Sequence, residues 1–562
     1  MQLSSTAAYT PTRNETTPIP SDSASCSKDS RATCQAFVTL TAGAAAMAYI
    51  LALLPAAGHD QIWFLLMARR LLDGAKLYGP EVFDSNPPLI VWLSAIPCTL
   101  ARWLHLPATA IGKALVAALE AAVWVACLRM TRALVHGLSR TAVWALGFAY
   151  IVIFACVPAR DFGQREHLLA LLCLPYLLAA AIALTGCPLT GWRATAVGVV
   201  AGLGLALKPH QLLVPIAVES LIIWKYARIW PRHARPWHFL RPEALGLIAV
   251  CFLYLSAISI FTPQYLTQVL PILRDTYWAI GGLSLPQLFL QAIQLHMLAA
   301  LAVGLYLVLQ RSSTADPQLP AAAEVFLIAG FAATVAYYLQ GTGWYYQQLP
   351  ALSFFAIASW IELLPIVRTQ GIRFSLRVPL AWPAGGLAIL AIALTAYFSG
   401  YSLSRPWEFP SGLARAPDPA FFTNLAPRTP VAILTTEVDL GIPRVLTDHL
   451  VWAQRTNNLW LMPAILGSEA PAPNDPEHRI PRAHLTQLDA MQHRWMVEDL
   501  TRWHPQLILI QRCHDPAVLC QKLEGRHDNL LTWFQRDPAF RAIFAHYRYL
   551  RSSGPFDGYV PD

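Results

Sequence analysis

The sequence predicts a polytopic α-helical membrane protein of about 11–13 spans with a C-terminal extramembrane α/β domain, and three observations lead to this prediction. Of the 562 residues, 55% are hydrophobic and 13% are charged, against about 25% charged in an ordinary soluble domain. The mean hydropathy is +0.42. Long apolar runs recur through residues 36–399, whereas the tail lacks them. This composition excludes a disordered chain, a coiled coil and a small disulfide-stapled secreted protein.

Charge divides the chain in two. Residues 400–562 carry 16 Lys and Arg against 17 Asp and Glu, while residues 1–399 carry 25 against 16. The near-neutral, charge-richer tail is typical of a soluble domain attached to a membrane body. The basic surplus of the body lies in short loops between apolar runs. This placement favours membrane orientation over nucleic-acid binding as the cause of the net charge of +8.

Twelve apolar runs are candidate spans. They lie at about 36–55, 88–104, 109–128, 141–157, 167–186, 194–207, 209–224, 243–261, 286–310, 321–339, 349–366 and 379–399. The loops 225–242 and 367–378 contain Lys or Arg and no acid, which predicts that both are cytoplasmic. The segments 158–166, 208–211, 262–285, 340–348 and 400–562 then lie outside.

An even number of spans cannot join a cytoplasmic N-terminus to an external C-terminus, so we expect eleven or thirteen. Pro97, Arg102 and Pro107 interrupt the region 88–128, and one piece of it is expected to be re-entrant or interfacial. The predicted location is the bacterial inner (plasma) membrane, crossed several times.

Three parts follow from these patterns. Residues 1–35, rich in Ser and Thr and without an apolar period, are expected to be a disordered cytoplasmic leader. Residues 36–399 form the membrane domain, with an external loop at 56–88. Residues 400–562 form a small periplasmic α/β domain.

The tail alternates short strand-like and helical stretches. They are the β-like runs Val431–Thr435 and Leu507–Gln511 and the helical stretches Trp495–His504 and Asn529–Phe534. Cys513 and Cys520 also lie in the tail, seven residues apart. In an oxidising periplasm these two can form a disulfide, and two free thiols are the alternative.

The first external loop places an acid just after the first span. His59 and Asp60 precede an amphipathic stretch whose apolar face is formed by Ile62, Leu65, Leu66 and Leu72, with Arg69 and Arg70 on the polar side. Such a helix is expected to lie along the membrane surface and to hold Asp60 where a lipid-linked headgroup would be. The alternative is that Asp60 only caps the helix.

The other external loops also gather polar side chains. The candidate binding residues are Arg160, Asp161, Gln164, Arg165, Glu166 and His167 in the second loop, Lys208 and His210 in the third, Arg274 in the fourth, and Gln340, Trp344, Tyr345 and Tyr346 in the fifth. Ionisable groups at membrane depth are costly and tend to be functional. The structural alternatives are internally paired solvated charges in the second loop, a snorkelling Lys208 and an aromatic belt at 344–346.

Aromatic rings beside amides and glycines suit sugar recognition, and cations suit a phosphate. The sequence contains no P-loop, no HExxH and no CxxC motif, so a nucleoside-triphosphate enzyme and a thiolate zinc site are unsupported.

This layout resembles the GT-C superfamily of membrane glycosyltransferases, and more closely its family-39-type and aminoarabinose-transferase-like members. An acid directly after the first span, an amphipathic helix, the segment GAKLY…FDSNPPL and an external α/β tail carry the resemblance. It covers about 36–399, and residues 56–90 are its most specific part. Asp60 matches the family's catalytic base, Asn86-Pro87-Pro88 its Pro-Pro element and Asp161 its second acidic position.

The resemblance implies an inverting sugar transfer from a polyprenyl-phosphate donor to an envelope glycan, lipid or protein. A divalent metal is one cofactor that the family allows. However, Gln61 follows Asp60 where several relatives have a second acid, and the Asp161 loop lacks a DxD pattern. Two other classes stay open: a lipid or sugar transporter or flippase, and a non-catalytic envelope assembly protein. The second of these predicts that Asp60 and the loop 160–167 point away from each other.

Overall fold

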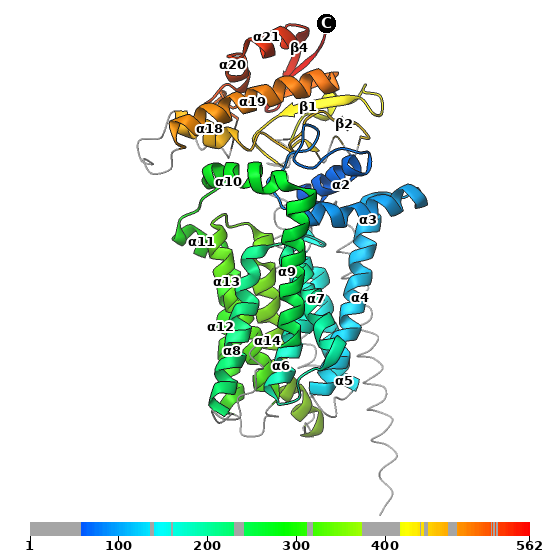
Figure 1. Ribbon diagram of the computed structural model, residues 1–562, viewed down its shortest axis with the longest axis vertical. Helices are drawn as coiled ribbons and strands as arrows, with labels where there is room; N and C mark the ends of the chain where they lie inside the picture. The colour runs from blue at the N-terminus through cyan, green and yellow to red at the C-terminus, as the bar shows by residue number, and fades with distance from the viewer. Residues whose placement is uncertain are drawn as a thin grey trace, which may run out of the picture.

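The protein is an upright bundle of helices that carries a smaller α/β domain on one end (Figure 1). The computed structural model describes residues 58–134, 140–158, 161–229, 241–311, 318–373, 416–469 and 480–562, apart from 439, 443, 444, 446, 447, 519, 521, 522 and 524–526. The predicted leader, the first run at 36–55 and the last run at 379–399 lie outside these residues, so the span count stays a prediction.

Helices make up the body. They are α2 (His59–Leu72), α3 (Leu89–Leu104), α4 (Ala108–Leu134), α5 (Arg140–Ile151), α6 (Arg165–Leu184), α7 (Gly191–Ala206), α8 (Leu213–Ile229), α9 (Pro242–Phe261), α10 (Leu270–Thr276), α11 (Leu285–Gln291), α12 (Ile293–Arg311), α13 (Gln318–Gln340) and α14 (Leu349–Arg373). Shorter turns of helix join them: η1 (Val152–Cys156), η3 (Pro209–Leu212), η5 (Tyr265–Val269), η6 (Tyr277–Ile280) and η7 (Tyr345–Gln348). Each apolar run predicted between 109 and 366 is therefore helical.

Among the described residues, four helices are long and apolar enough to cross a membrane: α4, α6, α9 and α13. A fifth crossing is possible by length if α11 and α12 act together, although they meet at 73°. One span over 286–310 stays a prediction, and the run has a sharp bend. The bend falls at Ala292, after the short helix that Ser284 and Gln287 begin with reciprocal hydrogen bonds.

Helix α3 lies across the end of the bundle rather than along it (Figure 1). Its 16 residues reach about 24 Å, less than the hydrocarbon core of a bilayer. Trp103 and Leu104 at its far end are strongly exposed. Helix α3 is therefore the candidate for the interfacial piece expected in the region 88–128, and that position stays a prediction.

Helix α2 forms where it was predicted, and its apolar residues pack within the protein. All seven residues from Ile62 to Ala68 are buried, and they belong to one apolar cluster that continues into the α/β domain. The domain covers the side of α2 that an isolated amphipathic helix would turn to its surroundings. Arg70, expected on a polar face, is half-buried.

A five-stranded sheet in the order β2-β1-β3-β5-β4 forms the α/β domain. The elements are η8 (Pro419–Phe421), β1 (Pro430–Leu434), β2 (Val451–Trp452), α18 (Met462–Glu469), α19 (Arg482–Trp503), β3 (Leu507–Gln511), α20 (Leu530–Phe534), α21 (Pro538–Phe544), β4 (Tyr547–Ser553) and β5 (Phe556–Pro561). The two predicted strand-like runs are β1 and β3, which pair in parallel and are almost wholly buried. The predicted helical stretches are the end of α19 and α20. Cys513 and Cys520, which follow β3, are joined by a disulfide.

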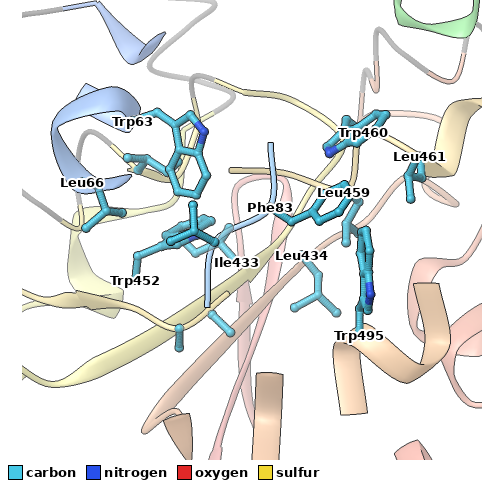
Figure 2. Packing of buried hydrophobic residues seen from close by; sticks show 14 of the residues in the cluster. Trp63, Leu66, Phe83, Ile433, Leu434, Trp452, Leu459, Trp460, Leu461 and Trp495 are labelled. Carbon is cyan, nitrogen blue, oxygen red and sulfur yellow. The ribbon is translucent and has the colours of Figure 1, made fainter. Parts of the chain in front are cut away.

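The domain and the first loop share one hydrophobic core, which Figure 2 shows. Trp63 and Leu66 reach it from α2, and Trp452 reaches it from β2. Phe83 of the loop inserts between them and α19, with its ring centroid 4.4 Å from that of Trp495. The α/β domain is therefore packed onto the segment that begins with Asp60.

One arginine reinforces this junction. The guanidinium of Arg70 donates to the carbonyl oxygens of Glu81 at 2.7 Å and Gln454 at 2.9 Å, and also to that of Trp452. It lies 4.9 Å from the ring centroid of Trp503. Burial lowers the pKa of Arg70 to about 10, so the side chain stays charged at neutral pH. A planar fork with several fixed donors suits such a set of carbonyls better than a single ammonium does.

In the bundle, α7 and α9 approach through glycines. A Cβ atom at Gly198 would lie 1.9 Å from the carbonyl oxygen of Glu243, and one at Gly246 would lie 2.5 Å from that of Thr195. Small residues at such a contact let two backbones approach, which is how many membrane helices associate.

Replacement of Gly198 with Ala should destabilise the bundle by about 1–3 kcal/mol, because the added methyl group meets backbone that cannot turn away. The measurement is thermal unfolding of the detergent-solubilised protein. Gly304→Ala is the matched control, since nothing lies within 4 Å of a Cβ there. Equal melting temperatures for the two variants would contradict this account of the α7–α9 contact.

Replacement of Arg70 with Lys should loosen the α/β domain by about 1–3 kcal/mol, because buried carbonyl oxygens lose their donors. We expect faster amide hydrogen exchange at 81–83 and 452–455 under native conditions. Arg69→Lys, at the neighbouring exposed position, is the control and should leave exchange unchanged. Unchanged exchange in Arg70→Lys would show that the apolar core holds the domain without this side chain.

Candidate active site

Four segments that are distant in the sequence meet at the end of the bundle beneath the α/β domain. They are the start of α2, the turn before α6, the turn between α7 and η3, and the segment that leads into η7. Each brings polar side chains that the sequence analysis had selected. The predicted divergence of Asp60 from the loop 160–167 does not occur.

Asp60 lies at the meeting point. The Gln164 amide donates to its Oδ2 at 3.1 Å, and Nη2 of Arg165 lies 3.3 Å from the same oxygen. Nε2 of His59 lies 3.3 Å from the other carboxylate oxygen. Gly58, not Asp60, stands at the N-cap of α2. The carboxylate is therefore directed to the second loop, and capping alone does not explain it.

The charge state of Asp60 follows from these neighbours. Burial acts to raise the pKa of the carboxyl, but the imidazole of His59 and the guanidinium of Arg165 together lower it by more. The pKa of Asp60 therefore lies well below its usual range. Asp60 is ionised at neutral pH although its side chain is only 13% exposed.

Arg165 links α6 to two parts of the first loop. Besides Asp60, its guanidinium donates to Oδ1 of Asn86 and lies 4.9 Å from the ring centroid of Phe64. The side chain is 4% exposed. Its Nε atom is buried and has no hydrogen-bond acceptor among the residues that the structure describes. This donor is therefore available to an acceptor atom of a ligand.

The loop that presents Asn86 is itself held in place. Asp84 accepts hydrogen bonds from Nε1 of Trp63 at 3.0 Å and from the backbone amide of Asn86 at 2.9 Å. Burial raises the pKa of Asp84 above its usual value, against the opposing effect of these hydrogen bonds. Tyr78 donates to the carbonyl oxygen of Asn86 at 2.6 Å. Asn86 thus meets Arg165 from a fixed backbone.

Lys208 adds a second cation. Its Nζ lies 2.8 Å from Oε1 of Glu166, which is fully buried, so the ammonium does not snorkel to solvent. It also lies 5.9 Å from the ring centroid of Tyr346. Burial and the nearby charge of Arg165 lower the pKa of Lys208, and Lys208 in turn lowers that of Asp60. Two cations, both mostly buried, therefore lie beside Asp60.

His167 connects the second loop to α4. Its Nδ1 accepts a hydrogen bond from the backbone amide of Gly163 at 2.9 Å, and its Nε2 lies 3.3 Å from Oε1 of Glu120. Sequence reasoning missed Glu120. It is the one acid in the apolar run 109–128, and an ionisable residue within a candidate span is a signal that could have found it.

The segment 340–348 brings aromatic rings to the site, whereas the amide of Gln340 does not reach it. The Tyr345 hydroxyl donates to the carbonyl oxygen of Val157 at 2.6 Å, and Asp161 lies near enough to raise its pKa further above the value that burial sets. The rings of Trp344 and Tyr346 lie 5.6 Å apart. Gln340 lies outside this group and donates to its own helix, at Ala336.

Two of the other predicted binding residues take different places. His210 is close to Lys208 and Arg165, and burial and these cations lower its pKa to about 3, so its ring is neutral at pH 7. Arg274 is exposed and pairs with Asp275 at 3.5 Å, and Asp275 also contacts His484 of the α/β domain at 2.8 Å. Arg160 lies outside the described residues.

The donor set does not fit a metal ion. Over the described part of the chain, no three His, Cys, Asp or Glu side chains gather in a way that could hold one. The oxygens of Asp60 are already engaged by Gln164, Arg165 and His59. A hard cation prefers several oxygen ligands and would meet two fixed positive charges here.

No family model matches the sequence, and no curated protein matches it. Among solved structures, the chain is similar to ArnT from Cupriavidus metallidurans bound to undecaprenyl phosphate, at 13% identity and a TM-score of 0.47 over 93% of this chain and 98% of that one. It is also similar to the oligosaccharyltransferase AglB from Archaeoglobus fulgidus in complex with an inhibitory peptide and a dolichol-phosphate. There the identity is 13% and the TM-score 0.43, over 95% of this chain and 74% of that one. Both scores are low, so the proposed function rests on the site's own residues.

Replacement of Lys208 with Met should destabilise the protein by about 3–5 kcal/mol, because the buried Glu166 carboxylate loses its counter-ion. The double variant Lys208→Met/Glu166→Gln removes both charges and should regain most of that loss. Thermal unfolding in detergent measures both.

The matched control is Lys225→Met, which breaks the more exposed pair of Lys225 with Glu324 and should cost no more than about 1 kcal/mol. A double variant as unstable as Lys208→Met would mean that the unpaired charge of Glu166 does not cause the loss of stability.

Proposed function

We propose that this protein is an integral-membrane glycosyltransferase that moves a sugar from a polyprenyl-phosphate donor to an acceptor hydroxyl. The observation that carries the proposal is the buried, ionised Asp60 beside two cations, Arg165 and Lys208. Perturbed titratable groups held close together in a sheltered site are typical of catalysis. Asp60 is also the residue that the resemblance to membrane glycosyltransferases matches to the catalytic base.

Arg165 and Lys208 suit the phosphate of the donor. The Nε atom of Arg165 lacks an acceptor, and Lys208 has three donors of which Glu166 takes one. Their charges repel each other, and this repulsion adds to burial in lowering the pKa of Lys208. An anion bound between them relieves this repulsion and gains charge-assisted hydrogen bonds. The same cations stabilise the negative charge that gathers on the phosphate as it leaves.

Asp60 suits the role of general base. The acceptor hydroxyl attacks the anomeric carbon and gives its proton to the Asp60 carboxylate. The bond between that carbon and the phosphate oxygen breaks, and its electron pair leaves with the polyprenyl phosphate. Direct attack of this kind inverts the anomeric configuration. A positioned base contributes roughly 10²–10⁴-fold to such a step.

The pKa of Asp60 is low while no sugar donor is bound. A carboxylate with so low a pKa is a weak base. A donor phosphate that pairs with Arg165 and Lys208 neutralises two of the charges that lower it, so the pKa of Asp60 rises when the donor binds. The base then gains strength only in the complex in which it is needed.

The rival functions have less support. A scaffold protein gives no reason for Asp60, Gln164 and Arg165 to converge from segments about a hundred residues apart. A transporter predicts its binding site near the middle of the membrane, between broken helices. Here the cluster lies at the end of the bundle, beneath the α/β domain.

The proposal extends to the surroundings of the enzyme. We infer the bacterial inner membrane, with the site and the α/β domain on the periplasmic side, from the basic loops 225–242 and 367–378. The acceptor is an envelope glycan, lipid or protein. The donor's polyprenyl chain lies against the apolar helices. No step requires a metal ion.

Asp60→Asn should lower kcat by about 10²–10⁴-fold and leave the fold intact, because an amide oxygen still accepts from Gln164 and Arg165 but cannot take a proton. The measurement is sugar transfer by the purified protein with a panel of polyprenyl-phosphate sugars in membranes that hold the native acceptors.

Asp73→Asn is the matched control. Asp73 follows the other end of α2, is exposed and pairs with Arg102, and its replacement should leave kcat unchanged. Transfer by Asp60→Asn at a near wild-type rate would exclude Asp60 as the base.

A further inference from the structure

A separate cleft of about 530 Å³ opens between the membrane body and the α/β domain. Its lining comes from the loop 76–83, from the segment around η5 and from the outward side of α19, the helix that lies across the domain in Figure 1. A volume of this size suits a small ligand of one or two sugar rings. None of the residues assigned above to the base or the phosphate lines it.

The charges of the cleft favour an anion. Its lining holds three cations, Lys76, Arg455 and Arg494, and one acid, Glu498. Arg455 is neutralised by Asp499 at 2.8 Å and Glu498 at 2.7 Å. Arg494 is mostly exposed and lies 3.8 Å from the same Glu498.

Lys76 pairs with no acid in the part of the chain that the structure describes. The Lys76 ammonium and the weakly paired Arg494 guanidinium therefore face the cleft. Glu498, the acid of the lining, is shared between Arg494 and Arg455.

The neutral groups favour hydroxyls. The side chains of Gln264 and Gln268, four residues apart at η5, both line the cleft. Neither makes a hydrogen bond to another described residue, so four amide donors and two carbonyl acceptors stay available between them. Tyr78 and Trp495 supply apolar surface beside these amides. Amides and rings next to spare cations are the combination that an acidic sugar requires.

Hydrogen bonds connect the lining of the cleft to Arg165 of the candidate active site. Tyr78 lines it and donates to the carbonyl oxygen of Asn86, whose side chain accepts from Arg165. Tyr78 has a φ of 60°, a backbone conformation that costs a bulky residue free energy and is retained most often at functional positions. The loop 76–86 thus lines the cleft at Tyr78 and contacts Arg165 at Asn86.

We propose that this cleft binds the acceptor, through an acidic sugar whose hydroxyls contact Gln264 and Gln268 and whose anionic group contacts Lys76 and Arg494. This inference rests on the proposed function, which supplies the second substrate. It assigns the donor phosphate to Arg165 and Lys208 and the acidic sugar of the acceptor to the cleft, so that both can be bound at once while another hydroxyl of the acceptor reaches Asp60.

The test is to measure the binding of glucose 1-phosphate to the full-length protein in detergent by saturation-transfer NMR. We expect saturable binding that is at least about tenfold tighter than that of inorganic phosphate or of glucose, because both halves of the ligand are recognised. Lys76→Ala and the double variant Gln264→Ala/Gln268→Ala should each weaken it by about tenfold.

Arg548→Ala, which removes an exposed cation from β4 at the sheet edge, is the control and should bind as wild type does. Equal binding of phosphate and glucose 1-phosphate would overturn the proposal in favour of a simple anion site. So would wild-type affinity in both cleft variants.

Undecaprenyl phosphate distinguishes the two sites. It should bind together with glucose 1-phosphate and with unchanged affinity in the cleft variants. Competition between the two ligands would overturn the assignment of the cleft to the acceptor.

Asp60→Asn should bind glucose 1-phosphate normally, because Asp60 does not line the cleft. Failure of the base hypothesis in the transfer assay therefore leaves the binding result intact, and failure of the binding result leaves the transfer assay intact.

Discussion

The guanidinium of Arg165 joins the parts of this molecule that matter for its chemistry. It reaches Asp60 at the start of α2, Asn86 at the end of the first loop and the ring of Phe64 between them. A buried arginine must satisfy its charge and its donors inside the protein, because desolvation otherwise costs several kcal/mol, roughly. Those requirements hold α2 and the loop against α6. Together with His59, the Arg165 guanidinium also keeps Asp60 ionised.

The α/β domain takes part in the same arrangement. Its core continues through Phe83 and Trp63 into α2, so the helix that carries Asp60 is buried on the side where a membrane-surface helix would be free. Arg70, near the other end of α2, binds carbonyl oxygens of the domain. The site is thus built on a helix fixed at both ends. Precise placement of a base beside a phosphate needs such rigidity, since errors of about 1 Å in geometry are costly.

Several features of the site could be predicted because they are local. The loops that bear Asp60, Arg165 and Lys208 stand out as polar interruptions between apolar runs, and an ionisable group at that depth is costly wherever it points. The strands β1 and β3 follow from their apolar runs, and the disulfide pairs the two closely spaced cysteines of the tail. Other features could not be predicted. Arg274 has the composition of a binding residue but is exposed, because α10 turns it away from the cluster.

By itself the sequence determined that the chain has apolar helices, which loops carry the charges and where an α/β tail begins, because hydropathy is a property of each segment alone. Only the tertiary structure decided which charges meet. Asp60 and Arg165 are separated by 105 residues. Glu120 meets the second loop only because His167 packs beside it. The burial of α2 beneath the domain and the cleft beside Tyr78 also arise between segments. Pairing and packing depend on neighbours that are distant along the chain, and a local pattern holds no record of them.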